Sequence, residues 1–280
     1  MKANLHMHSI HSDGHLPVFK LVERLEKLNF DYMALTDHDT IDGLKELKEA
    51  TKDTKIKPVF GLELSTVRNN ESIHVLGYFK EDSSFEAIES YLNMQKLKRE
   101  ERAKKMCDNL AKYFNINIDY EELFKYAKGV IARPHIAEMI IKNGYNYTWD
   151  EIFDKIISED SPVYVPSTKI SYDEGVELLK NSGLIAVLAH PGLYHKNRIE
   201  DLIKSGIDGI ECIYPAHKDE EMEKYIKLAK ENHLLITSGS DFHFDGDLRH
   251  GSLDEIRYVD FYNEYIKKFL NKLKERMSYE

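Results

Sequence analysis

The stretch "NLHMHSIHSDG", residues 4–14, places histidines in an otherwise apolar segment close to the start of the chain. Residues i and i+2 of a β-strand point to the same side, so a strand over residues 2–8 presents His6 and His8 together. The Ser-Asp-Gly tripeptide that follows is typical of a turn, which would bring Asp13 back towards the two histidines. This pattern suits a metal ion. On this fragment alone, an incidental histidine-rich start or the remnant of a tag explains it equally well.

Short apolar runs recur along the rest of the chain, and most of them are followed by a segment with helical periodicity. The run at 2–8, for example, precedes residues 16–29, in which apolar side chains recur at helical spacing. Strands that alternate with helices predict an α/β fold with a parallel sheet or barrel. The further runs lie at 30–38, 56–67, 72–79, 183–190, 207–214 and 234–243. A short turn-like link at 68–71 predicts that two of them form a hairpin.

Residues 82–165 interrupt this alternation with successive helical segments. We therefore expect a barrel made of residues 1–81 and 166–280, with residues 82–165 as a helical insertion. The basic run at 96–105 is interleaved with glutamates, so we expect a solvated helix face there rather than a nucleic-acid patch.

Composition narrows the class of protein. The chain has 280 residues, 42% of them hydrophobic and 31% charged, which is ordinary for a globular protein. No apolar run reaches membrane-spanning length and no signal peptide is evident, so we expect a cytoplasmic protein without a membrane role. Its two cysteines cannot form a disulfide framework. The net charge of −10 argues against a long-range attraction for nucleic acid, although a metal-loaded acidic cluster can still bind phosphate.

Strand after strand ends in, or closely carries, a side chain that can bind a metal. Functional groups of α/β barrels gather at the carboxyl ends of the strands, so these residues should be neighbours. One of them, His74, lies near the start of its strand, and an antiparallel hairpin would return it to the same rim. The set is His6, His8, Asp13, His38, Glu63, His74, His190, Asp241 and His243.

Each of these residues alone has an ordinary structural explanation, such as a turn, a helix cap or a buried ion pair. Together they would bury six histidines and three carboxylates at one site, which is costly unless cations pair them. Nine ligands exceed the needs of one ion. Histidine and carboxylate without thiolate suit zinc, manganese or iron better than calcium. We therefore expect two or three divalent ions, bridged by Glu63, that activate water and clamp a phosphoryl group.

Six motifs taken in order resemble the polymerase-and-histidinol-phosphatase (PHP) family, over about residues 2 to 250. They are "HMHSIHSDG", "ALTDHDT", "GLELS", "IHVLGYF", "VLAHP" and "GSDFH". The motifs "ARPHIAEMI" and "SPVYVP" narrow the resemblance to the phosphoesterase branch often labelled TrpH-like. That branch includes 3′,5′-nucleotide bisphosphate phosphatases and a 5′-to-3′ exoribonuclease activity on short RNA.

The resemblance implies a distorted (β/α)7 barrel whose active site is capped by the helical insertion and holds three metal ions. The first ion would be held by His6, His8, Glu63 and Asp241, the second by Asp13, His38 and His243, and the third by Glu63, His74 and His190. A hydroxide that bridges two ions would attack phosphorus in line. Glu63, Asp241 and His190 would then be catalytic. Manganese, zinc and iron all occur in the family.

The insertion carries the predicted substrate-binding residues Arg133 and His135. An arginine suits bidentate phosphate binding, and a 3′,5′-bisphosphate has a second phosphate to hold, although Arg133 could instead make a structural ion pair. His195 and His250 lie near motifs, and we expect both at the surface. The implied substrate is a small phosphorylated molecule, a nucleotide or short oligonucleotide, with no obligate protein partner.

Two other functions stay open. Histidinol-phosphate phosphatase shares the barrel and the metal site, but the insertion with "RPH" argues against it. A metal-stabilised binding module of the kind attached to DNA polymerases would tolerate the loss of ligands, and all nine ligand positions are intact.

Overall fold

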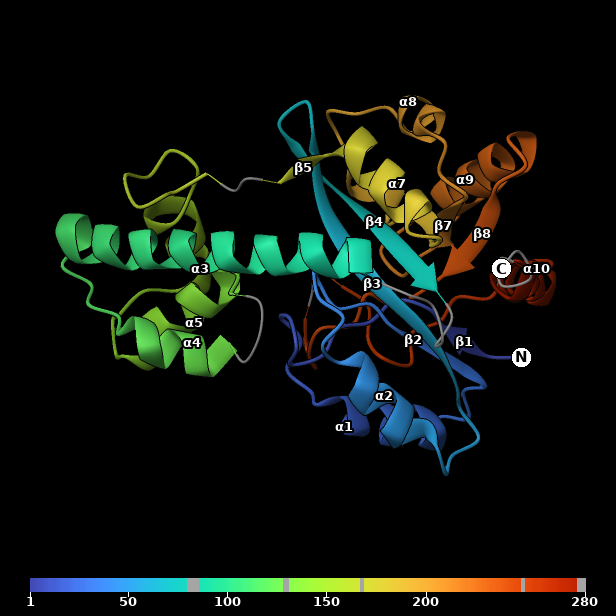
Figure 1. Cartoon of the computed structure of the whole chain (residues 1–280), viewed down its shortest axis with the longest axis horizontal. Helices are drawn as coiled ribbons and strands as arrows, with labels where there is room; N and C mark the ends of the chain where they lie inside the picture. The colour runs from blue at the N-terminus through green and yellow to red at the C-terminus, as the bar shows by residue number, and fades with distance from the viewer. Residues whose placement is uncertain (80–85, 128–130, 167–168, 248–249, 276–280) are drawn as a thin grey trace.

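One curved sheet organises the barrel (Figure 1). The structure is a computed structural model, and it describes residues 1–79, 86–127, 131–166, 169–247 and 250–275. Within these ranges the strands follow the spatial order β1-β2-β3-β4-β6-β7-β8, and β5 pairs with β3 at the side. Their bounds are β1 Ala3–Asn4, β2 Tyr32–Leu35, β3 Lys57–Arg68, β4 Glu71–Phe79, β5 Ile170–Ser171, β6 Ile185–Leu188, β7 Gly209–Ile213 and β8 Leu235–Ser238.

β4 is antiparallel to both of its neighbours, while the other neighbouring strand pairs are parallel. The β3–β4 hairpin turns at Asn69 and Asn70, which have φ values of 50° and 55°. Asparagine tolerates this left-handed conformation better than most residues. The register then places His74 opposite Ser65. The hairpin predicted from the link at 68–71 is confirmed, and it carries His74 back to the rim.

The first and last strands meet and nearly close the barrel. Leu5 N–H donates to the Ser238 carbonyl at 3.0 Å, and His8 N–H donates to the Phe242 carbonyl at 2.9 Å. Closure removes most of the exposed sheet edge. The structure confirms the predicted α/β fold with a distorted seven-stranded barrel.

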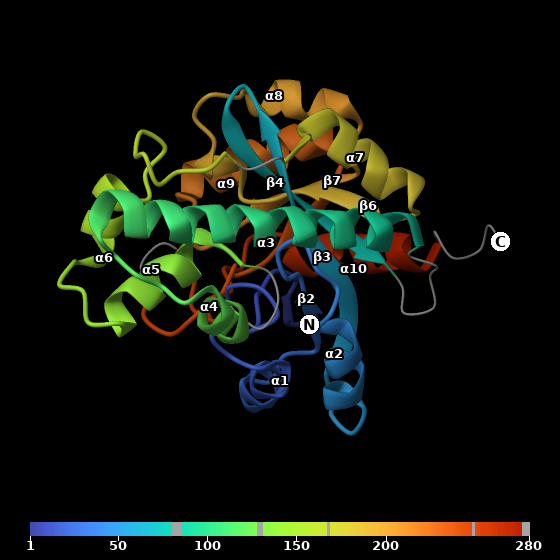
Figure 2. The same ribbon diagram turned by 60° about the vertical axis from the view of Figure 1, so that its left-hand side comes forward.

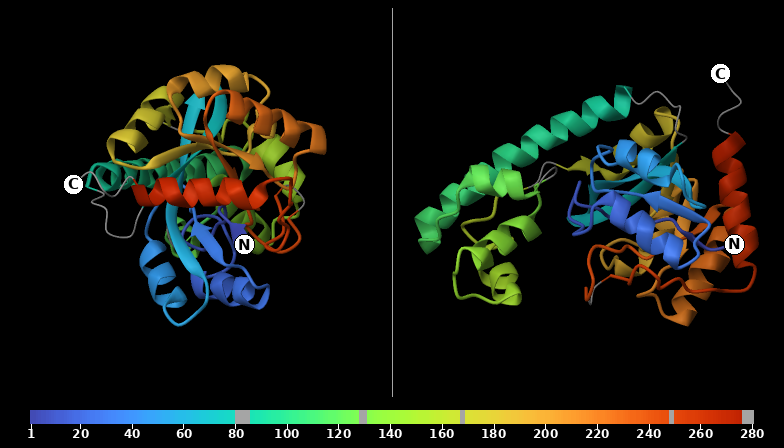
Figure 3. Two further views of the ribbon diagram at one scale, coloured as in Figure 1. Left: turned by 90° about the vertical axis from the view of Figure 1, so that its right-hand side faces the viewer. Right: turned by 90° about the horizontal axis from the view of Figure 1, so that it is seen from below.

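Helices cover the outside of the barrel: α1 Val18–Lys27, α2 Leu44–Thr51, α7 Tyr172–Asn181, α8 Ile199–Leu202, α9 Asp219–Glu231 and α10 Tyr262–Glu275. Short 3-10 turns occupy Pro191–Leu193 and Ile203–Ser205. α1 buries Val18, Leu21 and Leu25 at the predicted helical spacing. α10 packs its Phe269 ring edge-on against Tyr78, with 4.9 Å between ring centroids. Figure 3 shows α10 on the side of the barrel away from the insertion.

The insertion consists of α3 Glu86–Phe114, α4 Tyr120–Ala127, α5 Arg133–Lys142, α6 Trp149–Glu151 and a π-helical turn at Ile152–Ile156. We call these helices the cap. Figure 2 shows α3 crossing the barrel, with α4 and α5 beneath its far end. Buried cap residues such as Leu110, Leu123 and Ile140 form a hydrophobic cluster separate from that of the barrel. The predicted boundary at residues 81–82 lies outside the described residues.

No helix in the described ranges combines the length and the apolar character needed to cross a membrane.

Candidate metal centre and substrate cavity

The predicted metal ligands gather at one end of the barrel, where the parallel strands have their carboxyl ends. His38 follows β2, His190 follows β6, and Asp241 follows β8. His6 and His8 follow β1, which is only two residues long, yet an isolated bridge from Met7 to Phe242 keeps this segment extended. The local alternation therefore turns both histidine rings to the same side, as the sequence predicts.

Glu63 on β3 lies at the centre of the group, fully buried. Its Oε2 is 3.2 Å from His6 Nε2, 3.1 Å from His8 Nε2 and 3.2 Å from His38 Nδ1. Its other oxygen, Oε1, faces a different pair of histidines.

That second pair comes from β4 and from the end of β6. Glu63 Oε1 is 3.0 Å from His74 Nδ1 and 3.1 Å from His190 Nε2. One carboxylate thus divides its two oxygens between two sets of imidazoles, an arrangement that suits a bridge between metal ions.

Asp241 and Asp13 complete the cluster. Asp241 Oδ1 is 3.1 Å from His6 Nε2 and 3.0 Å from His8 Nε2. Asp13 Oδ1 is 3.4 Å from His243 Nε2, and Asp13 Oδ2 is 4.0 Å from His38 Nε2. The turn at 10–13 thus brings Asp13 back as the sequence predicts.

Four overlapping groups among the described residues have ligand atoms within 4.8 Å of one another. The three that lie around Glu63 and Asp13 are His6, His8, Glu63 and Asp241; His8, Asp13, His38 and His243; and His38, Glu63 and His74. The fourth is Asp241, His243 and His250.

Several polar atoms of the cluster are buried without a hydrogen bond from any residue that the structure describes: His8 Nδ1, Asp13 Oδ1, His38 Nδ1 and Glu63 Oε2. Such atoms are costly inside a protein. In addition, His6 Nε2 and His8 Nε2 face each other at 3.2 Å. Two imidazole nitrogens at that distance either share a proton or point their lone pairs at a common cation. The donor set and its unsatisfied atoms fit divalent metal ions.

The carboxylates of the cluster stay ionised. Burial alone would raise the pKa of Glu63, but the nearby His38, His6 and His74 hold it well below its usual range. Burial would likewise raise the pKa of Asp241, and His6 heads the groups that lower it. These carboxylates are therefore available as anionic ligands.

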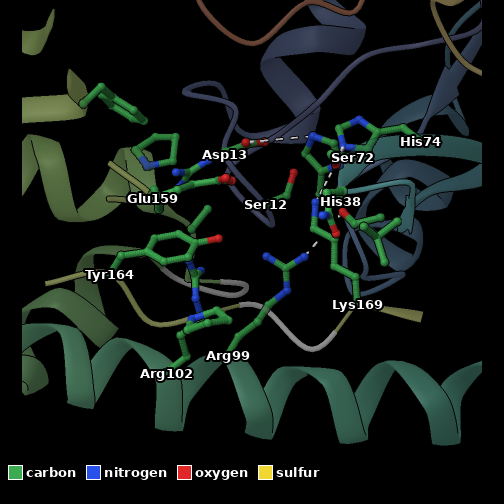
Figure 4. A pocket seen from close by; sticks show the side chains of 18 residues that line it. Ser12, Asp13, His38, Ser72, His74, Arg99, Arg102, Glu159, Tyr164 and Lys169 are labelled. Atoms are coloured by element: carbon green, nitrogen blue, oxygen red, sulfur yellow. Dashed lines mark hydrogen bonds and ion pairs between the residues drawn. The ribbon is translucent and has the colours of Figure 1, made fainter. Parts of the chain in front are cut away.

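A cavity of about 480 Å³ extends from Asp13, His38 and His74 to the cap (Figure 4). Four cationic side chains line it: Arg99, Arg102, Arg133 and Lys169. In Figure 4, Arg99 and Arg102 extend from α3 into the cavity. The chain as a whole carries a net charge of −10, so this concentration of positive charge is a local feature.

Tyr164 helps to place two of these cations. The guanidinium carbon of Arg102 lies 5.6 Å from the centre of the Tyr164 ring, and that of Arg133 lies 5.8 Å from it. Arg102 Nε–H also donates to the Val165 carbonyl at 2.6 Å. Burial, followed by the nearby Arg133 charge, lowers the pKa of Arg102 to about 10. Two guanidinium groups beside the same ring at the wall of the cavity favour the binding of an anion there.

Comparison of the sequence with models of known protein families identifies the family of this chain. A family model described as PHP domain matches residues 4–160. This chain belongs to the PHP family.

Individual PHP relatives extend the match over most of the chain. A 5′-3′ exoribonuclease of Haemophilus influenzae is 30% identical over 249 residues, covering 87% of this chain and 90% of that protein. A 3′,5′-nucleoside bisphosphate phosphatase of Chromobacterium violaceum is 30% identical over 252 residues, covering 87% and 88%. The crystal structure of a metal-dependent phosphoesterase from Bifidobacterium adolescentis superposes with a TM-score of 0.83 at 27% identity, covering 97% and 96%. The predicted family and enzyme class, a metal-dependent phosphoric ester hydrolase, are confirmed.

The PHP cap departs from the sequence prediction at two points. Residues 96–105 do not form a uniformly solvated face, because Arg99 and Arg102 turn towards the cavity. Arg99 also forms an ion pair with Asp39 on the barrel rim. His135, which we expected to contact substrate, is buried and is absent from the described residues that line the cavity. Its Nδ1 instead accepts the Ala132 N–H at 3.0 Å, so it holds the start of α5.

Two residues near the PHP centre escape the sequence prediction. His250, expected at the surface, stacks on His243 with 4.2 Å between ring centroids, and its Nε2 is 3.8 Å from Asp241 Oδ2. It lies outside the described strands, so no strand periodicity indicates its position. Glu211 is buried on β7 behind the cluster. Its signal in the sequence is a carboxylate inside the apolar run at 207–214.

Proposed function

We propose that this PHP protein hydrolyses phosphate esters of nucleotides, acting on 3′,5′-nucleoside bisphosphates or on the 5′ ends of short RNA. The observation that carries the proposal is the shared cavity: candidate metal ligands form one wall, and four cationic side chains project from the others. A substrate with two phosphates on one nucleoside offers one anion to each side.

The nine residues would hold two or three divalent ions, manganese, zinc or iron. The assignment follows the three sets given by the resemblance: His6, His8, Glu63 and Asp241; Asp13, His38 and His243; and Glu63, His74 and His190. When bound, the ions lower the pKa of a water molecule and neutralise charge on the phosphoryl oxygens. Glu63 would contribute a ligand to both the first and the third set, and Asp241 and His190 would hold the ions next to the reacting phosphate.

The protein itself positions the part of the substrate that does not react. Arg133 and Arg102 bind the second phosphate with charge-assisted hydrogen bonds, and Tyr164 keeps their guanidinium groups in place. Lys169 donates to Ser72 Oγ at the opposite side of the cavity. We propose residues 82–165 as the unit that supplies the arginines, with the barrel supplying the ligands.

The names of the relatives support this substrate class. One is named as an exoribonuclease that works from 5′ to 3′, and another as a phosphatase of 3′,5′-nucleoside bisphosphates. Histidinol phosphate has a single phosphate and a positively charged amine, which the four cations of the cavity would repel. A binding module without catalysis has no need of a complete ligand set next to a substrate-sized cavity.

The test is phosphate release by the manganese-loaded protein from adenosine 3′,5′-bisphosphate, beside AMP and histidinol phosphate. We expect release mainly from the bisphosphate, and its loss in Glu63→Ala. Release from histidinol phosphate alone would replace this proposal with the amino-alcohol substrate. Absence of release from all three substrates, with metal bound, would favour the binding module.

A further inference from the structure

Glu211 on β7 lies directly behind the candidate metal ligands, although sequence and family motifs give it no part in the site. Its side chain is fully buried. Both of its oxygens are 3.1 Å from His6 Nδ1, the ring nitrogen on the far side from the cluster. Its Oε2 also accepts the backbone N–H of His190 at 2.9 Å.

The contact with His6 selects one tautomer. Both Glu211 oxygens lie at hydrogen-bond distance from Nδ1 and accept its N–H, so Nδ1 is the ring nitrogen that carries a proton towards β7. His6 Nε2 is the nitrogen that would face a bound ion, and it lies 3.2 Å from Glu63 Oε2 and 3.1 Å from Asp241 Oδ1. This is the form in which a histidine binds a metal, with a carboxylate behind it that fixes the ring and increases its basicity.

The contact with His190 supports a strained piece of backbone. His190 has φ 24° and ψ 63°, values that residues other than glycine rarely adopt. Just beyond it, Gly192 N–H donates to His217 Nε2 at 3.1 Å. His217 in turn bonds the Cys212 carbonyl through Nδ1 at 3.1 Å. The segment that carries His190 is thus anchored at two points to β7 and the loop after it.

The packing of Gly239 against His6 and Glu211 leaves no space for a side chain at position 239. A Cβ atom placed on Gly239 would lie 2.2 Å from His6 Cβ and 2.7 Å from Glu211 Oε1. Because the backbone just after β8 passes this close, neither the His6 ring nor the Glu211 side chain can move far from its present orientation.

We propose that Glu211 is a positioning residue for two metal sites at once: it fixes the tautomer of His6 and the backbone of His190. The inference rests on the metal cluster proposed above. In Glu211→Gln, the NH2 group faces the Nδ1–H donor of His6 in either orientation of the amide, and the negative charge behind the ring is lost. Loss of such an outer carboxylate weakens metal binding by about 10–100-fold.

The test is a titration of chelator-treated protein with cobalt(II) chloride, followed by visible absorption, which reports coordination without relying on catalysis. The matched control is Cys212→Ala, the buried neighbour on the same strand, which belongs to none of the candidate ligand groups among the described residues. We expect Glu211→Gln to bind cobalt about 10–100-fold more weakly and with a changed spectrum. Cys212→Ala should bind like the parent even if it is less stable.

The outcomes distinguish a failure of the proposed metal cluster from a failure of the proposed role of Glu211. A parent protein that binds no cobalt would refute the metal cluster itself. A parent that binds cobalt, with unchanged binding and spectrum in Glu211→Gln, would overturn only the role of Glu211. If circular dichroism shows that Glu211→Gln is unfolded, Glu211→Asp is titrated instead, because it keeps the charge but is too short to make both contacts. Parent-like binding by Glu211→Asp would likewise overturn the proposal.

Discussion

Glu63 presents its two carboxylate oxygens to two different sets of histidines. Its oxygens are only about 2 Å apart by covalent geometry, yet they face imidazoles that reach the site from β1, β2, β4 and β6. A single buried carboxylate therefore ties together the ends of strands that are far apart in the sequence. Its low pKa, which nearby histidines maintain against the effect of burial, keeps it anionic for this purpose.

Arg133 is the residue on which the substrate proposal can be tested most directly. Hydrogen bonds to a charged group contribute about 1.5–3 kcal/mol, so Arg133→Ala should raise KM for adenosine 3′,5′-bisphosphate roughly 10–100-fold. Arg133→Lys should lie between parent and alanine, because lysine keeps the charge without the bidentate geometry. Steady-state kinetics on the purified variants measures both.

AMP serves as the control substrate because it lacks the second phosphate. Its low rate of hydrolysis should be nearly the same in Arg133→Ala and in the parent. An equal loss on AMP and on the bisphosphate would mean that Arg133 supports the fold of the cap rather than the second phosphate.

The position of an individual side chain can be predicted from the sequence where strand geometry fixes it. The prediction for His74 needed only a hairpin, and the register of β3 with β4 supplies it. It fails for His135 and His250, whose surroundings depend on loop conformation and on the packing of the cap. The spacing of apolar and polar residues along the sequence does not predict such contacts.

The start of α7 shows how the local sequence determines where a helix begins. Ser171 Oγ accepts the Glu174 N–H at 3.3 Å, and the Glu174 carboxylate accepts the Ser171 N–H at 3.3 Å, which is a capping box. Ser171 also pairs with Val67 of β3, so the cap of this helix coincides with the end of β5.

Ser171→Ala should therefore lower the free energy of unfolding by about 1 kcal/mol. Urea denaturation followed by circular dichroism measures the change. Ser182→Ala, at the other end of α7, is the control, because Ser182 Oγ has no hydrogen-bond partner among the residues that the structure describes. Equal effects of the two substitutions would argue against the capping box.

The sequence of the long helix α3 does not determine which of its faces turns towards the barrel. Charged residues surround it on most sides between 96 and 105, so the pattern does not say which face turns inward. The choice comes from tertiary contacts: Arg99 pairs with Asp39, and Lys96 Nζ lies 3.3 Å from Asp42 on the barrel. The alternation of strands and helices was predictable, whereas the orientation of the cap over the rim was not.

For the whole molecule, removal of metal should have a large effect on stability. Without cations, the cluster leaves buried polar atoms unsatisfied among the described residues. A ligand present at about 1,000 times its Kd stabilises the folded state by about 4 kcal/mol. In a chain of this length, treatment with EDTA should lower the melting temperature by roughly 10 °C, and added manganese or zinc should restore it.

Differential scanning calorimetry measures this shift. The Glu63→Ala variant should respond less to EDTA, because it lacks the proposed bridge. A parent protein with the same melting temperature in EDTA and in excess metal would contradict a metal cluster at the barrel mouth.

The nearly closed seam between the first and last strands has a consequence for biosynthesis. His6 leaves the ribosome early, whereas its partner Asp241 follows more than two hundred residues later. At about 5–20 residues per second, the nascent chain spends roughly ten seconds or more without the last ligand of this set. The proposed first set would therefore be completed only late in synthesis, so the ions that it binds would be those available to the finished barrel.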